Sequence, residues 1–169
     1  MASRVHDFAM APAIPTHEIP EVAAGPVRFL LASKPPPVWS LSSKATVFEA
    51  ISVMAEKGIG ALLVMEGNAL IGIISERDYA RKVILRGRSS KDTPISEIMT
   101  SPVITVSPDH SIEECMRLMT EKRIRHLPVV EDGLVAGIVS IGDIIKVLLS
   151  AQAQAIRHLS AYIAGSYPA

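Results

Sequence analysis

The sequence contains an internal repeat, and this repeat constrains the fold more than any other feature. When the chain is shifted by 65 positions, residues 38–83 overlay residues 103–148 without a gap. Roughly three positions in ten are identical, which is far above chance for a gap-free overlay. The chain is therefore predicted to fold one supersecondary unit twice.

Each copy predicts the same order of elements, β-α-β-β-α. The first copy gives a strand over 38–41, a helix that opens at Thr46, a hairpin over 61–74 and a helix over 76–86. The second copy gives the equivalent elements over 103–106, from Ser111, over 127–139 and over 141–150. Both first helices open with a capping box, in which a Thr or Ser hydroxyl caps a backbone N–H and a Glu three residues later reaches back.

The hairpin strands consist of continuous apolar runs, which are typical of strands buried on both faces. One such unit cannot bury its sheet alone, whereas two units packed sheet to sheet can. The prediction is an α+β fold in which two β-α-β-β-α repeats pack by pseudo-twofold symmetry through their sheets.

The repeat divides the chain into four segments. Residues 1–26, rich in Pro and Ala and without periodicity, are predicted to be a flexible N-terminal arm. The first motif is predicted over 27–88, opened by a short helix over 27–32, and the second over 92–150. Residues 151–169 are predicted to be a C-terminal helix and tail, because Ile156, Leu159 and Ile163 recur at helical spacing.

The composition disfavours several classes of protein. The formal net charge is +0, so a nucleic-acid partner is disfavoured, and the basic stretch over 77–91 is predicted to be a solvated face. The lone Cys115 can form no internal disulfide. No apolar run approaches the ~20 residues of a membrane span, and the first residues lack a signal-peptide core. The expectation is a cytoplasmic protein without membrane contact.

Two signatures close the repeats, Gly72-Ile73-Ile74-Ser75-Glu76-Arg77-Asp78 and Gly137-Ile138-Val139-Ser140-Ile141-Gly142-Asp143. With the run over 123–130, they resemble the CBS domain family, named after cystathionine β-synthase. The resemblance covers nearly all of residues 27–150. It implies a disc-like module with two clefts for AMP, ADP, ATP, NAD or S-adenosyl compounds, without a required metal. It also implies a homodimer formed through the helices of the module.

The resemblance places Ser75 with Asp78, and Ser140 with Asp143, in these clefts. Each carboxylate would accept hydrogen bonds from the two ribose hydroxyls, since it has two acceptor oxygens. Each Ser would assist near the ribose or phosphate at a helix N-terminus. Capping alone also explains both pairs, because Ser-x-x-Asp is a helix-capping pattern. Both interpretations stay open at the level of sequence.

Phosphate contacts are expected from Arg125 and His126, since a guanidinium pairs bidentately with phosphate oxygens. The first copy has Gly60 and Ala61 at the equivalent positions, which leave room for a nucleotide but carry no charge. The two clefts are therefore expected to differ. The cleft with Asp143 would use its own repeat's basic pair, and the cleft with Asp78 would use Arg77 or borrow that pair across the pseudo-twofold. An ordinary solvated face is the alternative for Arg123 and Arg125.

The remaining candidates have weaker support. Ile73 and Ile138 could flank the adenine or be plain core. Thr100 precedes the second copy's first strand and is placed near the first cleft. Gly142 lies within the second signature.

No catalytic constellation is found, since the chain lacks a P-loop, HExxH and G-x-S-x-G. The predicted function is that of a non-enzymatic sensor, in which a bound adenine nucleotide changes how an unidentified regulated protein is contacted. AMP is the favoured ligand, and ATP, ADP and NAD(H) are the alternatives. The competing hypothesis is a ligand-independent interaction module for thioredoxin-type or metabolic enzyme partners, because the chain also resembles plant organellar proteins linked to thioredoxin.

Overall fold

The computed structural model describes residues 25–33 and 38–163. The first repeat comprises β1 (Ser40–Leu41), α2 (Val47–Lys57), β2 (Ala61–Glu66), β3 (Ala69–Ser75) and α3 (Glu76–Lys82). The second comprises α4 (Ile112–Glu121), β4 (His126–Glu131), β5 (Leu134–Ser140) and α5 (Ile141–Ile163). Three short helices complete the described chain: α1 (Val27–Ser33), η2 (Ile84–Arg86) and η3 (Ile95–Glu97).

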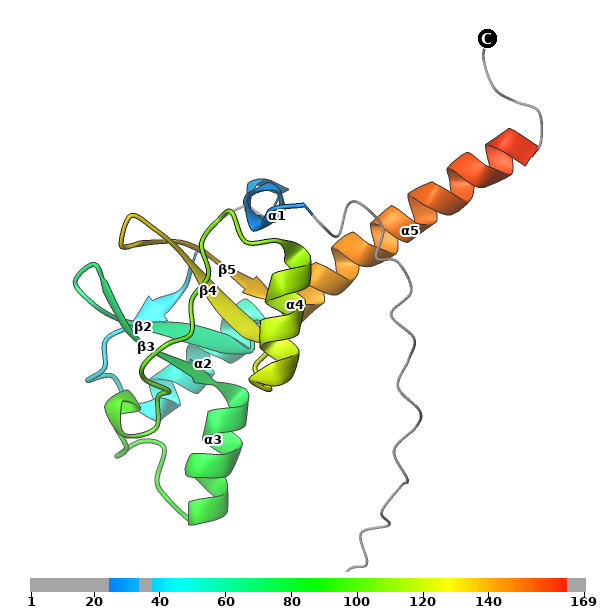
Figure 1. The fold of residues 1–169 in the computed structure, drawn as a ribbon. Helices are drawn as coiled ribbons and strands as arrows, with labels where there is room; N and C mark the ends of the chain where they lie inside the picture. Colours follow the sequence, from blue (N-terminus) through cyan, green and yellow to red (C-terminus); the bar gives the residue numbers. More distant parts are fainter. Residues whose placement is uncertain (1–24, 34–37, 164–169) are drawn as a thin grey trace, which may run out of the picture.

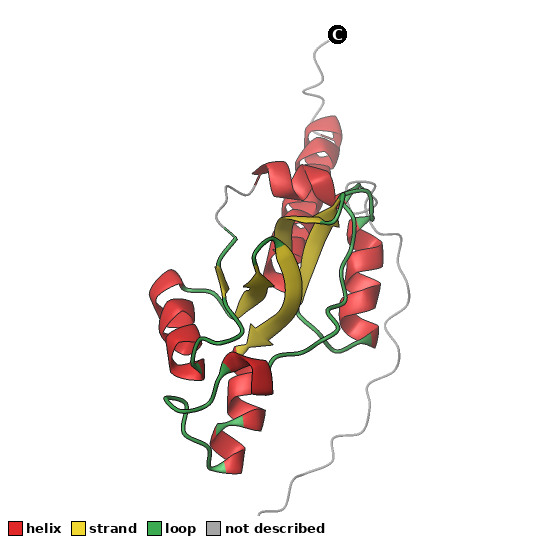
Figure 2. Ribbon diagram, turned by 90° about the vertical axis from the view of Figure 1, so that its left-hand side faces the viewer, coloured by secondary structure: helices red, strands yellow, loops and turns green. Residues whose placement is uncertain are grey.

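Two hairpins form the centre of the molecule. In the first sheet β2 pairs in parallel with β1 and antiparallel with β3, and in the second sheet β4 and β5 pair antiparallel. The hairpins lie side by side with β3 in contact with β5, and the helices surround them (Figures 1 and 2). This is the predicted α+β architecture of two repeats packed through their sheets.

The capping boxes form as predicted. The Glu49 N–H donates to Thr46 Oγ1 at 3.2 Å, and the Thr46 N–H donates to the Glu49 carboxylate at 2.6 Å. Ser111 and Glu114 form the same pair of bonds at 3.1 and 2.8 Å. These backbone bonds hold the pKa of both glutamates below its ordinary value, because they stabilise the charged carboxylate. The sequence therefore predicted both helix starts correctly.

The predicted strand over 103–106 is wrong, because only Val106 pairs, through a single parallel bridge to Val129. In the first repeat, the Leu63 N–H donates to the Trp39 carbonyl at 3.2 Å and holds β1 on the sheet. The residue equivalent to Leu63 is Pro128, which has no N–H to donate. The ladder therefore loses a bond, and the strand shortens to one bridge.

Three predicted helices also have different bounds. The helix over 76–86 ends at Lys82 and continues as the 3₁₀ turn η2, which Gly87 ends with a φ of +62°. The helix predicted over 141–150 and the C-terminal helix predicted within 151–169 are one helix, α5, because no Gly or Pro stands between Asp143 and Ile163. Most of the predicted arm (1–24) and the tail (164–169) lie outside the described residues.

The two repeats exchange the segments that precede them. The buried core of the first repeat includes Ile95 and Ile98, which come from the connector to the second repeat. The buried core of the second repeat includes Val27 and Leu30 of α1, which precede the first. Neither core is therefore filled by its own repeat alone.

Matching hydrogen bonds hold both crossing segments. The Val27 N–H donates to the His110 carbonyl, and the Ile95 N–H donates to the Ala45 carbonyl, both at 2.8 Å. His110 and Ala45 are equivalent under the 65-residue shift. The exchange is therefore symmetric. Residues 25–28, at the end of the predicted arm and the start of α1, form backbone hydrogen bonds with the second repeat.

The glycine that opens each signature lies against a crossing segment. A Cβ built at Gly72 would lie 2.5 Å from the Met99 sulfur, and one built at Gly137 would lie 2.6 Å from a Leu31 methyl carbon. Either distance is shorter than a van der Waals contact. A side chain at either position would have to displace Met99 or Leu31, and glycine avoids this overlap.

We therefore predict that Gly72→Ala lowers the free energy of unfolding by about 1–2 kcal/mol, since overpacking displaces Met99. Urea denaturation measures this change. Gly142→Ala is the matched control, because a Cβ there meets only Ser140 Oγ at 3.7 Å and lies in a helix that favours alanine. Equal stability of Gly72→Ala and the wild type would show that the crossing segment does not require the glycine.

We also predict that the Cys115 thiol is unreactive in the folded protein. It is fully buried, and burial raises its pKa to about 11, with a smaller contribution from the Glu114 carboxylate. Very little thiolate is therefore present at pH 8, and reagents have no access to it. Thiol labelling should follow global unfolding in denaturant. Stoichiometric labelling of the native protein would contradict this prediction.

Candidate functional site

A cleft of about 700 Å³ opens between the two repeats. One wall comes from the end of β3 and the first turns of α3, and the other from the end of α4 and the segment that leads into β4. The connector contributes Thr100. The lining residues are Ala61, Ile73, Ser75, Arg77, Asp78, Arg81, Thr100, Met119, Thr120, Lys122, Arg123, Ile124, Arg125, His126 and Ile141.

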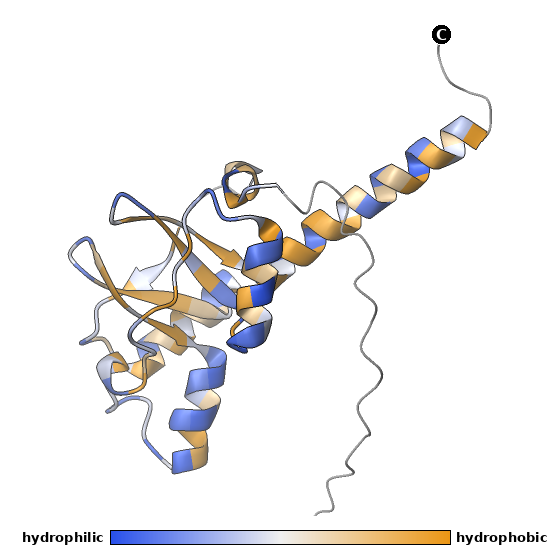
Figure 3. Ribbon diagram, in the orientation of Figure 1, coloured by the Kyte–Doolittle hydropathy of each residue, from blue (hydrophilic) through white to orange (hydrophobic). Residues whose placement is uncertain are grey.

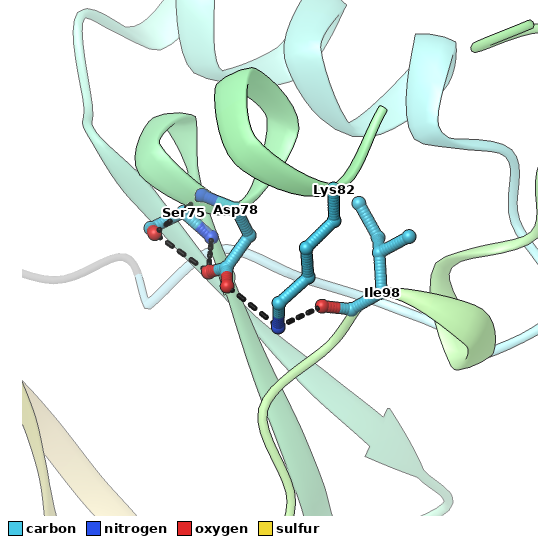
Figure 4. Close-up of polar contacts among 4 residues, drawn as sticks. All are labelled: Ser75, Asp78, Lys82 and Ile98. Carbon is cyan, nitrogen blue, oxygen red and sulfur yellow. Dashed lines mark hydrogen bonds and ion pairs between the residues drawn. The ribbon is translucent and has the colours of Figure 1, made fainter. Parts of the chain in front are cut away.

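Ser75 and Asp78 form a third capping box at the edge of this cleft. The Ser75 N–H and hydroxyl both donate to Asp78 Oδ2, at 3.0 and 2.6 Å, and the Asp78 N–H donates to Ser75 Oγ at 3.3 Å. Lys82 Nζ lies 2.8 Å from Asp78 Oδ1 and also donates to the Ile98 carbonyl at 2.7 Å (Figure 4). The helix start, the carboxylate and the connector are thus joined through one lysine.

These bonds limit what Asp78 can offer to a ligand. A carboxylate has about four lone-pair sites, and Ser75 and Lys82 occupy three of them. One acceptor site therefore remains on Oδ1, enough for one ribose hydroxyl without breaking an existing bond. The capping interpretation is correct for the geometry, and it leaves room for a ligand contact.

The equivalent pair in the second repeat lies outside the cleft. The Ser140 N–H and hydroxyl donate to Asp143 Oδ2 at 2.9 and 2.6 Å, so this pair also caps its helix. Two other candidates from the same signature, Ile138 and Gly142, are likewise absent from the lining. Val147 stands where the first repeat has Lys82, so this position provides no lysine for the second carboxylate.

Basic side chains dominate the cleft. Five cationic residues line it against a single lining carboxylate, that of Asp78, and the five are Arg77, Arg81, Lys122, Arg123 and Arg125. Arg77 Nη1 donates to the Arg123 carbonyl at 2.6 Å and so joins the two walls. Such a cluster provides bidentate donors for phosphate oxygens. Four of the five, all but Arg77, are exposed, so the alternative of a solvated face stays open beside that of a phosphate site.

Arg123 has an unusual backbone conformation. Its φ is +54°, and the equivalent Gly58 in the first repeat has a φ of +63°. The left-handed region costs a residue with a Cβ about 1 kcal/mol. The sequence placed Arg123 on a basic face but did not assign it to the cleft. The overlay of the two repeats contains a signal for Arg123, because it aligns this arginine with Gly58, the glycine that ends helix α2.

The other sequence candidates gather around the same cleft. Arg125 and His126 line it together with Asp78, whereas the sequence led us to expect this pair beside Asp143, which is not among the lining residues. Ile73 exchanges backbone bonds with Thr100 at 3.1 and 2.8 Å. Ala61 lines the cleft, and a Cβ at Gly60 would lie 3.4 Å from the His126 ring. Eight of the thirteen candidates are therefore lining residues.

Within the described part of the chain, no group of three or more His, Cys, Asp or Glu is placed to hold a metal ion. Over the same residues, no helix combines the length and apolar character needed to cross a membrane.

Comparisons with known proteins identify the family to which this fold belongs. The family described as CBS domain matches the chain twice, over residues 31–84 and 95–150. The mitochondrial CBS domain-containing protein CBSX3 of Arabidopsis thaliana is 45% identical over 127 residues, which cover 72% of this chain and 62% of that protein. The match therefore spans less than two thirds of that relative.

Two solved structures extend the comparison. A putative signal-transduction protein with CBS domains from Burkholderia ambifaria superposes with a TM-score of 0.72 at 49% identity, over 74% of this chain and 94% of that one. The CBS domain pair of protein MJ0100, in complex with 5′-methylthioadenosine and S-adenosyl-L-methionine, gives 0.67 at 28% identity, over 75% and 98%. This chain belongs to the CBS domain family and carries two CBS motifs in tandem.

Proposed function

We propose that this chain is a regulatory module that binds an adenine nucleotide in the cleft between its repeats. The observation that carries the proposal is the convergence of five cationic side chains and one carboxylate on a single cavity. The carboxylate suits a ribose hydroxyl and the cations suit phosphates. The adenosine compounds bound by the MJ0100 pair support a ligand of this class.

The charge of the cleft favours ligands with several phosphates. A cluster of five cations around one carboxylate attracts a polyanion more strongly than a single phosphate. ATP and ADP therefore come before AMP, the ligand favoured from the sequence. NAD(H), with two phosphates, lies between them, and S-adenosyl compounds, which have no phosphate, come last.

Because residues of both repeats line the cleft, a bound ligand can change how the two repeats are placed relative to each other. A ligand that contacts Asp78 and Arg125 joins the two repeats, so it stabilises one relative placement of them. Asp78 also reaches the connector through Lys82 and the Ile98 carbonyl. The role proposed is that of a non-enzymatic sensor whose regulated protein reads this placement. The cytoplasmic location expected from the sequence stays a prediction, since the Arabidopsis relative is described as mitochondrial.

The proposal predicts a ligand-dependent rise in thermal stability that depends on Asp78. The purified chain, stripped of carried-over nucleotide, is melted with ATP, ADP, AMP, NAD or S-adenosylmethionine. A ligand at a hundred times its dissociation constant adds about 2.7 kcal/mol to the free energy of unfolding. We expect the largest shift with ATP, and its loss in Asp78→Ala and Arg125→Ala.

Two control variants separate binding from capping. Glu49→Ala removes the acidic residue of another capping box, on a helix outside the cleft, so it should lower the melting temperature but keep the ATP shift. Asp143→Ala should behave in the same way. A shift that is lost in Asp143→Ala and kept in Asp78→Ala would place the ligand elsewhere. No shift with any nucleotide would favour the ligand-independent interaction module.

Arg123→Gly should change stability and binding in opposite directions. The variant places in the second repeat the residue that the first has at position 58, so it relieves the left-handed backbone. We expect the free energy of unfolding without ligand to stay equal or rise by up to about 1 kcal/mol. ATP affinity should fall, because a cleft cation is lost. Titration calorimetry and urea denaturation measure the two effects. Unchanged ATP affinity would remove Arg123 from the proposed phosphate contacts.

A further inference from the structure

Lys82 contacts the Asp78 carboxylate from outside the cleft. Its ammonium lies 2.8 Å from Asp78 Oδ1 and donates to the Ile98 carbonyl at 2.7 Å (Figure 4). Asp78 is one of the residues that line the cleft, whereas Lys82 is not. The lysine therefore occupies an acceptor site on the carboxylate without competing with a ligand for space in the cavity.

Two contacts fix the position of this ammonium. An Asp–Lys pair four residues apart on an exposed helix face is a common and weak interaction. Here the second contact joins the ammonium to the carbonyl of Ile98, a connector residue that is only 1% exposed. The Asp78 side chain is itself 16% exposed. The pair is therefore partly shielded from water, and we expect Lys82 to stay on the carboxylate when a ligand enters the cleft.

Helix α3 depends on polar contacts for its placement. It is hydrophilic over most of its length (Figure 3), and none of its residues is buried. The capping box holds its first turn at the end of β3, and the bond from Lys82 to the Ile98 carbonyl joins its last turn to the connector. Asp78 takes part in both arrangements, through Ser75 and through Lys82. Both oxygens of its carboxylate are therefore held by the protein.

The oxygen that faces Ser75, Asp78 Oδ2, has no acceptor site left for a ligand. It accepts bonds from the Ser75 N–H and hydroxyl at 3.0 and 2.6 Å. The N–H belongs to the backbone and cannot turn away, and the Asp78 N–H holds the hydroxyl oxygen in place through a 3.3 Å bond. Both lone pairs of Oδ2 are thus occupied, and Lys82 occupies one of the two on Oδ1.

Reading both hydroxyls of a ribose requires two acceptor sites, one for each O–H, and Asp78 offers one. We propose that Lys82 is a specificity-determining residue, which restricts Asp78 to one of the two ribose hydroxyls of a bound nucleotide. The inference rests on the proposed nucleotide site and narrows its ligand class. The cleft should tolerate a nucleotide that lacks one particular ribose hydroxyl and should discriminate against a nucleotide that lacks the other.

Titration calorimetry of the wild type with ATP, 2′-deoxyATP and 3′-deoxyATP tests this inference. We expect one analogue to bind about tenfold more weakly than ATP, because it leaves the last acceptor site on Asp78 without its hydroxyl. The other analogue should bind within about twofold of ATP, because Asp78 does not contact the hydroxyl that it lacks. All three ligands carry the same triphosphate, so the contribution of the phosphate contacts cancels in the affinity ratios.

The variant Lys82→Met removes the ammonium and keeps an unbranched side chain. Asp78 Oδ1 then has two acceptor sites, so both hydroxyls, which stand on neighbouring carbons, can donate to the carboxylate. We expect both analogues to bind at least about fivefold more weakly than ATP in this variant. Lys122→Met is the matched control, because it removes a lysine of the cleft lining instead. Its ATP affinity should fall, while its affinity ratios should stay those of the wild type.

Three results would overturn the inference. They are a wild type in which both analogues bind at least about fivefold more weakly than ATP, a wild type in which neither does, and a Lys82→Met variant with wild-type ratios. The wild-type titrations decide the first two, so the test does not depend on the variant, whose folding urea denaturation checks. A wild type that does not bind ATP would overturn the proposed function itself, and this result is distinct from the other three.

Discussion

The exchange of segments between the repeats is the constraint on which the rest of the structure depends. Each core is completed by residues that precede the other repeat, Ile95 and Ile98 in the first and Val27 and Leu30 in the second. In each exchange a side chain of the crossing segment packs directly against a glycine of the hairpin. The connector thereby lies along β3 and brings Thr100 to the edge of the cleft. The cavity is a consequence of how the two cores are closed.

The two repeats have nearly the same order of helices and strands but different charged residues at equivalent positions. Arg123 replaces the helix-ending Gly58, and Arg125 and His126 replace Gly60 and Ala61. Cations therefore gather on the wall that the second repeat contributes, opposite the Asp78 supplied by the first. The pseudo-symmetry creates two equivalent places in the fold, and these substitutions add cationic side chains to one of them.

Local sequence patterns predicted most of the secondary structure. The capping boxes at Thr46 and Ser111 and the turns of both hairpins depend on residues a few positions apart, so the sequence contains them directly. The strand predicted over 103–106 shortens to one bridge at Val106, because Pro128 on the neighbouring strand has no N–H to donate. Other features depend on contacts between residues far apart in the chain, and no local sequence pattern predicts them. These features are the exchange of segments and the shared cleft that Arg77, Arg81 and Arg123 line with Asp78.

The most direct measurement is a crystal structure of the full chain with ATP bound. The account predicts phosphate oxygens within hydrogen-bond distance of Arg125 and Arg123, and a ribose hydroxyl on Asp78 Oδ1. The ligand should contact both repeats, because Asp78 belongs to the first repeat and Arg123 and Arg125 belong to the second. Nucleotide bound on the Asp143 side, or contacts confined to one repeat, would contradict the account.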